Sequence, residues 1–194
     1  MKPLQDKIRQ VVALDESELA QFLGRFHKKE LAKDDYYCQE GQVMKSVAFV
    51  GQGILRYFYI KDGEEKTGQF FFEQGWVADY YSFLTQSPSN MFIQAIEDAV
   101  LYTLSYEDMQ SLYVEVPKTE KFGRVMAEQL FIGTQRRNRS LLSDSPAERY
   151  MELVRDRPKV IENIPLYMIA SYLGIQPESL SRIRKRIAQG DLRT

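Results

Sequence analysis

Three charged side chains near the C-terminus have the types and the spacing to read a nucleic acid. Glu178, Arg182 and Lys185 are four and three residues apart, so they share one face of a helix predicted to open at Gln176. In a DNA major groove, an arginine can form two hydrogen bonds to a guanine edge, and a glutamate can accept one from cytosine N4. This face therefore predicts contact with DNA bases.

Further polar and basic residues surround this face. Ser181 and Arg186 flank it, and the cationic groups of Arg184, Lys185 and Arg186 suit phosphates, which set affinity without regard to sequence. One alternative is a solvated helix end in a three-helix bundle, because runs of charge usually cover solvent-facing surfaces. Another is a small-molecule sensor or interaction module whose helices contact only other proteins.

The element that positions these residues is a predicted helix-turn-helix over residues 164–187. Its first helix ends at Gly174 and has an apolar face that we expect to be buried, made of Leu166, Ile169, Ala170 and Leu173. The second helix is expected to bury Leu180, Ile183 and Ile187. Because Ala170 is small, the two helices can cross closely, and Gly174 permits a left-handed turn.

Rare residues exclude most kinds of catalytic or metal site. The chain has one cysteine, Cys38, and one histidine, His27. Zinc and iron–sulfur sites, and metal centres on cupin-like barrels, need several such residues. No serine lies in a nucleophile elbow, and no glycine-rich phosphate-binding loop is present. We expect neither an enzyme nor a bound metal or cofactor.

The composition is that of a globular chain with unevenly placed charge. The 194 residues are 44% hydrophobic and 27% charged, and no apolar run is long enough to span a membrane. Residues 136–194 carry a net charge of +5, whereas residues 1–135 carry −6. We expect a soluble cytoplasmic protein with no membrane partner, whose basic C-terminal module faces a polyanion.

The first half of the chain is predicted to form two short helices followed by strands. The helices are expected over residues 3–12 and 15–24. Short aromatic and β-branched runs over 26–105 are typical of an antiparallel sandwich or barrel, with a hairpin turn at Asp62-Gly63. One helical interruption is expected over 76–84.

Helices are predicted after these strands. A short one covers 106–113, and a long one is expected over 118–143. Ser145 and Glu148 can form a capping box around Pro146 at the first helical position, so a further helix begins there. The long helix carries a stripe at spacings of three and four, made of Phe122, Val125, Met126, Gln129, Leu130 and Gly133.

The chain as a whole resembles the Crp/Fnr family of bacterial transcription regulators. The segment IASYLGIQPESLSRIRKR follows the family's helix-turn-helix pattern, and the resemblance covers nearly the whole chain. It implies an α+β fold with a jelly-roll-like β-roll of the cyclic-nucleotide-binding type, a dimerisation helix and a winged-helix-type helix-turn-helix domain. We place these parts at residues 1–116, 117–143 and 144–194. The hairpin wing of the family would be missing or very short.

The resemblance also implies partners and contacts. It predicts a homodimer, joined through the stripe of the long helix, that binds an inverted repeat in double-stranded DNA, with RNA polymerase as a further partner. Carried over by position, Pro177, Glu178 and Arg182 fall on base-reading positions, and Gln176 and Ser179 on phosphate contacts. Pro177 replaces a common arginine, so a different DNA site is expected. The predicted DNA-binding set is Gln176, Pro177, Glu178, Ser179, Ser181, Arg182, Lys185 and Arg186.

The predicted ligand half departs further from the family. Members that bind cyclic AMP have a phosphate-binding cassette where this chain has WVADYYSFLTQSPSNMFIQA. Asp79 replaces the glutamate that holds the ribose. No arginine lies around Pro88-Ser89-Asn90 to neutralise a phosphate, whose burial without a cation is costly. Cyclic AMP is therefore not expected.

Two hypotheses remain for the predicted ligand-binding domain. In the first, the pocket is filled by Tyr80, Tyr81 and Phe83 and binds nothing. In the second, it takes a less charged ligand at Asp79, Tyr80, Ser82, Ser89 and Asn90.

Overall fold

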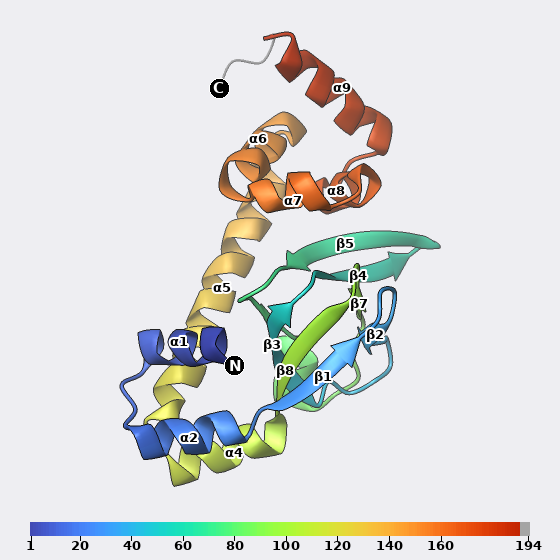
Figure 1. The fold of residues 1–194 in the computed structure, drawn as a ribbon. Coiled ribbons are helices and arrows are strands. Elements are labelled where there is room, and N and C mark those ends of the chain that lie inside the picture. The colour runs from blue at the N-terminus through green and yellow to red at the C-terminus, as the bar shows by residue number, and fades with distance from the viewer. Residues whose placement is uncertain (191–194) are drawn as a thin grey trace. The chain divides into compact units, whose positions relative to one another are not determined.

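The computed structural model describes residues 1–190 and consists of two compact units (Figure 1). The first unit contains Met1–Phe58 and Phe70–Leu130, and the second contains Tyr59–Gln69 and the chain from Phe131 onward. The predicted 144–194 domain and the segment where a wing would lie both end outside the described residues.

Two short helices open the first unit. α1 (Lys2–Val11) and α2 (Glu16–Gly24) lie within about one residue of the predicted ranges. α2 begins with a capping box, because the Asp15 carboxylate accepts from the Glu18 N–H and the Glu18 carboxylate accepts from the Asp15 N–H.

Strands follow and form two sheets. Among the described residues they are β1 (His27–Leu31), β2 (Tyr36–Cys38), β3 (Ser46–Gln52), β4 (Leu55–Lys61), β5 (Glu64–Phe71), β6 (Trp76–Val77), β7 (Phe92–Ala95) and β8 (Ala99–Ser105). One four-stranded sheet has the order β1-β8-β3-β6, and the other has the order β2-β7-β4-β5. The strand pairs with a determined register are antiparallel. The predicted β-roll and α+β class are confirmed.

The hairpin between β4 and β5 turns at Asp62-Gly63, as predicted. Both residues have positive φ, 53° and 77°, which a type I′ hairpin turn requires. The hairpin tip belongs to the second unit. There the Ser171 hydroxyl donates to the Glu65 carbonyl at 2.8 Å and accepts from the Thr67 N–H at 2.9 Å. Because β5 is an edge strand, this hydroxyl satisfies backbone groups that have no neighbouring strand.

The predicted helix over 76–84 is wrong in its first residues. Trp76–Val77 is strand β6, paired with β3, and the helix α3 covers only Tyr80–Thr85. The Trp76 ring packs 5.4 Å from the ring centroids of both Phe49 and Phe122. Such long-range packing, which periodicity does not reveal, places Trp76 in the sheet.

Two helices complete the first unit. They are α4 (Tyr106–Glu115) and the N-terminal part of α5 (Thr119–Ser143), so the predicted long helix is confirmed. Phe122 of α5 is only 7% exposed and packs edge-to-face on Phe22, with ring centroids 5.3 Å apart. The start of α5 is therefore part of the core of this unit.

The second unit contains the remaining helices of the described chain. They are α6 (Pro146–Asp156), α7 (Pro158–Asn163), α8 (Leu166–Leu173) and α9 (Pro177–Ala188). Ser145 and Glu148 form the predicted capping box at the start of α6. α8 ends at Gly174 with φ 70°, and the Ile175 N–H bonds the Ala170 carbonyl at 3.0 Å, as in a Schellman motif.

The buried face of α8 differs from the prediction in one member. Leu166 is 42% exposed, so the expectation that it is buried is wrong. Helical side chains lean toward the N-terminus, so the first residue of α8 leans past the end of the helix rather than onto the neighbouring helices. The buried residues of α8 are Met168, Ile169, Ala170, Tyr172 and Leu173.

Candidate functional site

The exposed side of α9 carries most residues of the predicted DNA-binding set. Leu180 is 1% exposed, as predicted, and packs one side of the helix against the unit, whereas Ile183 and Ile187 are half-buried rather than buried. Ser179 is also half-buried. The exposed members of the set are Gln176, Pro177, Glu178, Ser181, Arg182, Lys185 and Arg186. The structure therefore brings the whole set together on one helix and its N-cap.

The basic side chains of α9 have no ionic partner within residues 1–190. No ion pair there involves Arg182, Arg184, Lys185 or Arg186. Their charges are held in solvent and are available to an external anion.

Arg149 of α6 holds the turn that presents α9. Its Nε and Nη2 atoms donate to the Leu173 carbonyl at 3.1 and 2.9 Å, and its Nη1 atom donates to the Asp144 carbonyl at 2.5 Å. Leu173 is the last residue of α8, directly before Gly174. Sequence reasoning missed Arg149 because its partners are backbone carbonyls, which leave no residue-type signal.

Three of the five residues predicted for a ligand bind the protein's own backbone. The Asp79 carboxylate caps α3 by accepting from the Ser82 N–H at 3.2 Å. The Ser82 hydroxyl accepts from the Met44 N–H at 2.9 Å and donates to the Ser87 carbonyl at 2.5 Å. Both are buried, as is the third, Ser89, whose hydroxyl bonds the backbone of Met91 at 3.1 Å. These polar groups stabilise the segment between β6 and β7.

The other two predicted ligand residues lie apart from these. Asn90 is exposed. Tyr80 lines an apolar cavity, and burial raises the pKa of its hydroxyl to about 12, so this hydroxyl stays protonated at neutral pH. The structure therefore does not gather the five residues into one pocket.

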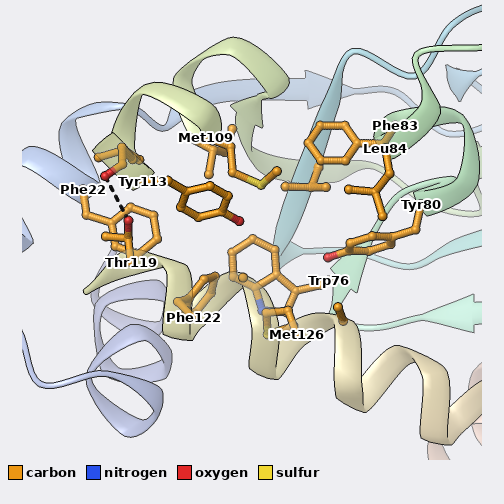
Figure 2. Close-up of a pocket in the computed structure, with 15 residues that line it drawn as sticks. Phe22, Trp76, Tyr80, Phe83, Leu84, Met109, Tyr113, Thr119, Phe122 and Met126 are labelled. Atoms are coloured by element: carbon orange, nitrogen blue, oxygen red, sulfur yellow. Dashed lines mark hydrogen bonds between the residues drawn. The ribbon is translucent and has the colours of Figure 1, made fainter. Parts of the chain in front are cut away.

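That apolar cavity lies among α3, α4, α5 and the β1-β8-β3-β6 sheet of the first unit (Figure 2). Figure 2 shows the rings of Trp76, Tyr80, Tyr113 and Phe122 around the space, and none of the 15 lining residues is charged. Its volume is about 60 Å³. An engineered protein cavity of ~150 Å³ holds a ligand as small as benzene, so this cavity is too small for a nucleotide.

An arginine that sequence reasoning missed, Arg56, is buried in the β2-β7-β4-β5 sheet. Arg56 of β4 is 4% exposed, bonds the Gln94 side chain at 2.8 Å, and lies 4.2 Å from the centroid of the Phe58 ring. Side chains alternate along a strand, and its neighbours Leu55 and Tyr57 pack on the core. Arg56 therefore lies on the other face of β4, together with the buried Phe58, and it does not line the aromatic cavity.

The stripe predicted for dimerisation is divided between the core and the surface. Phe122 is buried, and Met126 packs against the core of the first unit. Val125 is half-buried, and Gln129, Leu130 and Gly133 are exposed. The large exposed apolar side chains of α5 are Leu130, Phe131, Ile132, Leu141 and Leu142.

Comparison with known proteins supports the architecture. Residues 28–115 match the cyclic nucleotide-binding domain family. A comparison with curated proteins gives no match.

Several solved structures have folds similar to that of this chain. The c-di-GMP responsive global regulator CLP of Xanthomonas campestris is 18% identical with a TM-score of 0.68, over 92% of this chain and 94% of that chain. FixK2 of Bradyrhizobium japonicum is 16% identical with a TM-score of 0.70, over 87% and 88%. The catabolite activator protein of Thermus thermophilus is 20% identical with a TM-score of 0.56, over 94% and 88%. The predicted resemblance is confirmed in the fold.

No helix within residues 1–190 is long and apolar enough to cross a membrane. In the same residues, no three side chains of His, Cys, Asp or Glu gather closely enough to hold a metal ion.

Proposed function

We propose that this chain is a sequence-specific DNA-binding transcription regulator of the Crp/Fnr type that acts as a homodimer. The observation that carries the proposal is the surface of α9, whose exposed cations have no ionic partner within residues 1–190. This surface follows a left-handed turn at Gly174, as in a helix-turn-helix. The shared fold supports it.

In this proposal, the residues of α9 divide between bases and phosphates. Arg182 and Glu178 read base edges, because an arginine pairs with guanine and a glutamate accepts from cytosine. Lys185 and Arg186, nearer the C-terminus of the helix, bind phosphates. Gln176 and Ser179 at the N-terminus add phosphate contacts, and Pro177 supplies only apolar contact.

The dimer contact is proposed along α5. Since Phe122 and Met126 pack inside their own chain, the partner helix meets the exposed and half-buried residues, chiefly Val125, Gln129, Leu130, Phe131, Ile132 and Gly133. Two recognition helices related by twofold symmetry then enter successive major grooves ~34 Å apart, which predicts an inverted-repeat operator.

We propose that DNA binding does not need a cyclic nucleotide. The cavity of about 60 Å³ has no charged lining, and Asp79, Ser82 and Ser89 already bond the backbone. A buried cyclic phosphate would lack a cationic partner there.

Selection of bound sequences from a random duplex pool tests the proposal. We expect an enriched inverted repeat, bound without any added small molecule. Enrichment only after addition of a ligand would overturn the ligand-independent part. No enrichment under any condition, together with no retention on heparin, would favour a module that contacts only other proteins.

A further inference from the structure

We propose that the second unit binds a small phosphate-bearing anion in a polar cavity formed by α5, α6 and α8. The cavity has a volume of about 350 Å³, within the ~300–1,000 Å³ range of small-molecule sites. Four arginines line it: Arg136 and Arg137 of α5, Arg149 of α6, and Arg157 between α6 and α7.

The lining carries more positive than negative charge. Against the four arginines stand two carboxylates, those of Glu152 and Asp156. Asp156 is engaged by Arg155, which lies outside the lining, with 2.6 Å between Nε and Oδ1. Guanidinium groups gathered in one cavity repel one another, so an anion placed among them is favoured.

Two of the arginines are held in place by the protein. The guanidinium carbons of Arg137 and Arg157 lie 3.9 and 5.9 Å from the centroid of the Tyr172 ring. Arg137 also donates to the Tyr172 carbonyl, and Arg157 donates to the Gln69 side chain. These contacts orient both guanidinium groups, so their positive charges are fixed at the edge of the cavity.

Arg136 and Arg149 have different parts in the site. The Nε, Nη1 and Nη2 atoms of Arg149 donate to the Leu173 and Asp144 carbonyls, so Arg149 contributes mainly its positive charge to the cavity. No hydrogen bond or ion pair within residues 1–190 engages the exposed Arg136 side chain. We assign to Arg136 the principal contact with the anion.

The chemistry of the lining selects the class of ligand. Guanidinium groups form paired hydrogen bonds to phosphate oxygens, and the excess positive charge matches a dianion. The volume exceeds what a lone phosphate fills, so a phosphorylated sugar or nucleotide fits. The regulatory meaning of such a ligand rests on the proposed function, because Arg149 also holds the helix-turn-helix, but ligand binding itself does not.

Calorimetric titration of the full chain with pyrophosphate and with adenosine monophosphate tests the site. We expect one saturable site per chain. Arg136→Gln should lower the affinity about tenfold through the loss of a charged hydrogen bond. Arg139→Gln, which removes the same charge from α5 outside the lining, should leave it unchanged, and Glu152→Gln should raise it.

Three outcomes would overturn the proposal. The first is no saturable binding of either probe up to about 1 mM. The second is an equal loss of affinity in Arg136→Gln and Arg139→Gln, which would mean diffuse attraction to a basic helix. The third is displacement of the anion by duplex DNA together with equal loss of DNA binding in Arg136→Gln, which would assign the cavity to DNA phosphates. Because the titration contains no DNA, failure of the proposed regulator function leaves its result intact.

Discussion

The surface of α9 and the segment between β6 and β7 use polar side chains in opposite ways. On α9, Arg182, Lys185 and Arg186 are exposed and have no ionic partner within the described chain. Between β6 and β7, Asp79 and Ser82 are buried and bond the backbone. A polar group that already has a hydrogen-bond partner in the fold must lose that partner before it can bind a ligand. A charged group in solvent gives up only contacts with water. The difference agrees with the proposed function, in which the exposed side chains of α9 contact DNA and the polar side chains between β6 and β7 stabilise the first unit.

The largest expected effect comes from removing a side chain that lines the aromatic cavity of the first unit. Phe122→Ala should destabilise the first unit by ~3–5 kcal/mol, because a buried ring in contact with Phe22 and Trp76 is lost. Urea unfolding followed by tryptophan fluorescence measures this. Val114→Ala, on an exposed position of α4, is the control and should change stability by less than ~0.5 kcal/mol. Equal stability of the two variants would show that the cavity wall is not structural.

The next largest effect is expected on α9. Arg182→Ala should cost ~1–3 kcal/mol of DNA binding and relax preference at one base pair, because its contact is to a base edge. Lys185→Ala should weaken all duplexes about equally and reduce the salt dependence, because its contact is to phosphate. Binding constants for operator and scrambled duplexes separate the two. Unchanged specificity in Arg182→Ala would remove it from the base-reading residues.

A smaller effect separates a structural aspartate from a ligand-binding one. Asp79→Ala should destabilise the first unit by ~0.5–2 kcal/mol, the usual cost of losing a helix N-cap. Asn90→Ala, at an exposed position nearby, should cost less than ~0.5 kcal/mol. Thermal unfolding with and without cyclic AMP makes the measurement, and the nucleotide should shift neither variant. A stabilisation by the nucleotide that Asp79→Ala abolishes would contradict this account.

The smallest effect concerns the single thiol. Burial raises the pKa of Cys38 above its ordinary value, so its reactive thiolate is scarcer at pH 8 than that of an exposed thiol. Alkylation by iodoacetamide should therefore be slower in the folded chain than in urea. Equal rates in the two states would mean that this part of the core opens readily.

Local signals in the sequence predicted the elements well. The capping residues Ser145 and Glu148, the turn at Asp62-Gly63 and the helix end at Gly174 all lie where predicted. Each is decided by residues within about four positions, through hydrogen bonds or backbone preferences that follow from residue type.

Features set by distant contacts could not be predicted in this way. Trp76 joins a sheet because of Phe49 and Phe122, and Arg149 clamps a carbonyl 24 residues away. The sequence showed no arginine beside Pro88-Ser89-Asn90, but it could not show that Arg136, Arg137, Arg149 and Arg157 meet in one cavity of the second unit. Residue types alone do not reveal which elements will pack together.

The central claim, that α9 recognises DNA without a cyclic nucleotide, is tested most directly by fluorescence anisotropy. A labelled inverted-repeat duplex from the selection is titrated with the purified chain at 50 and 200 mM salt, with no small molecule added. We predict saturation at two chains per duplex, an affinity that falls about 10³-fold between the two salts, and weaker binding by Arg182→Ala. Equal binding by wild type and Arg182→Ala, or no binding until cyclic AMP is added, would contradict the claim.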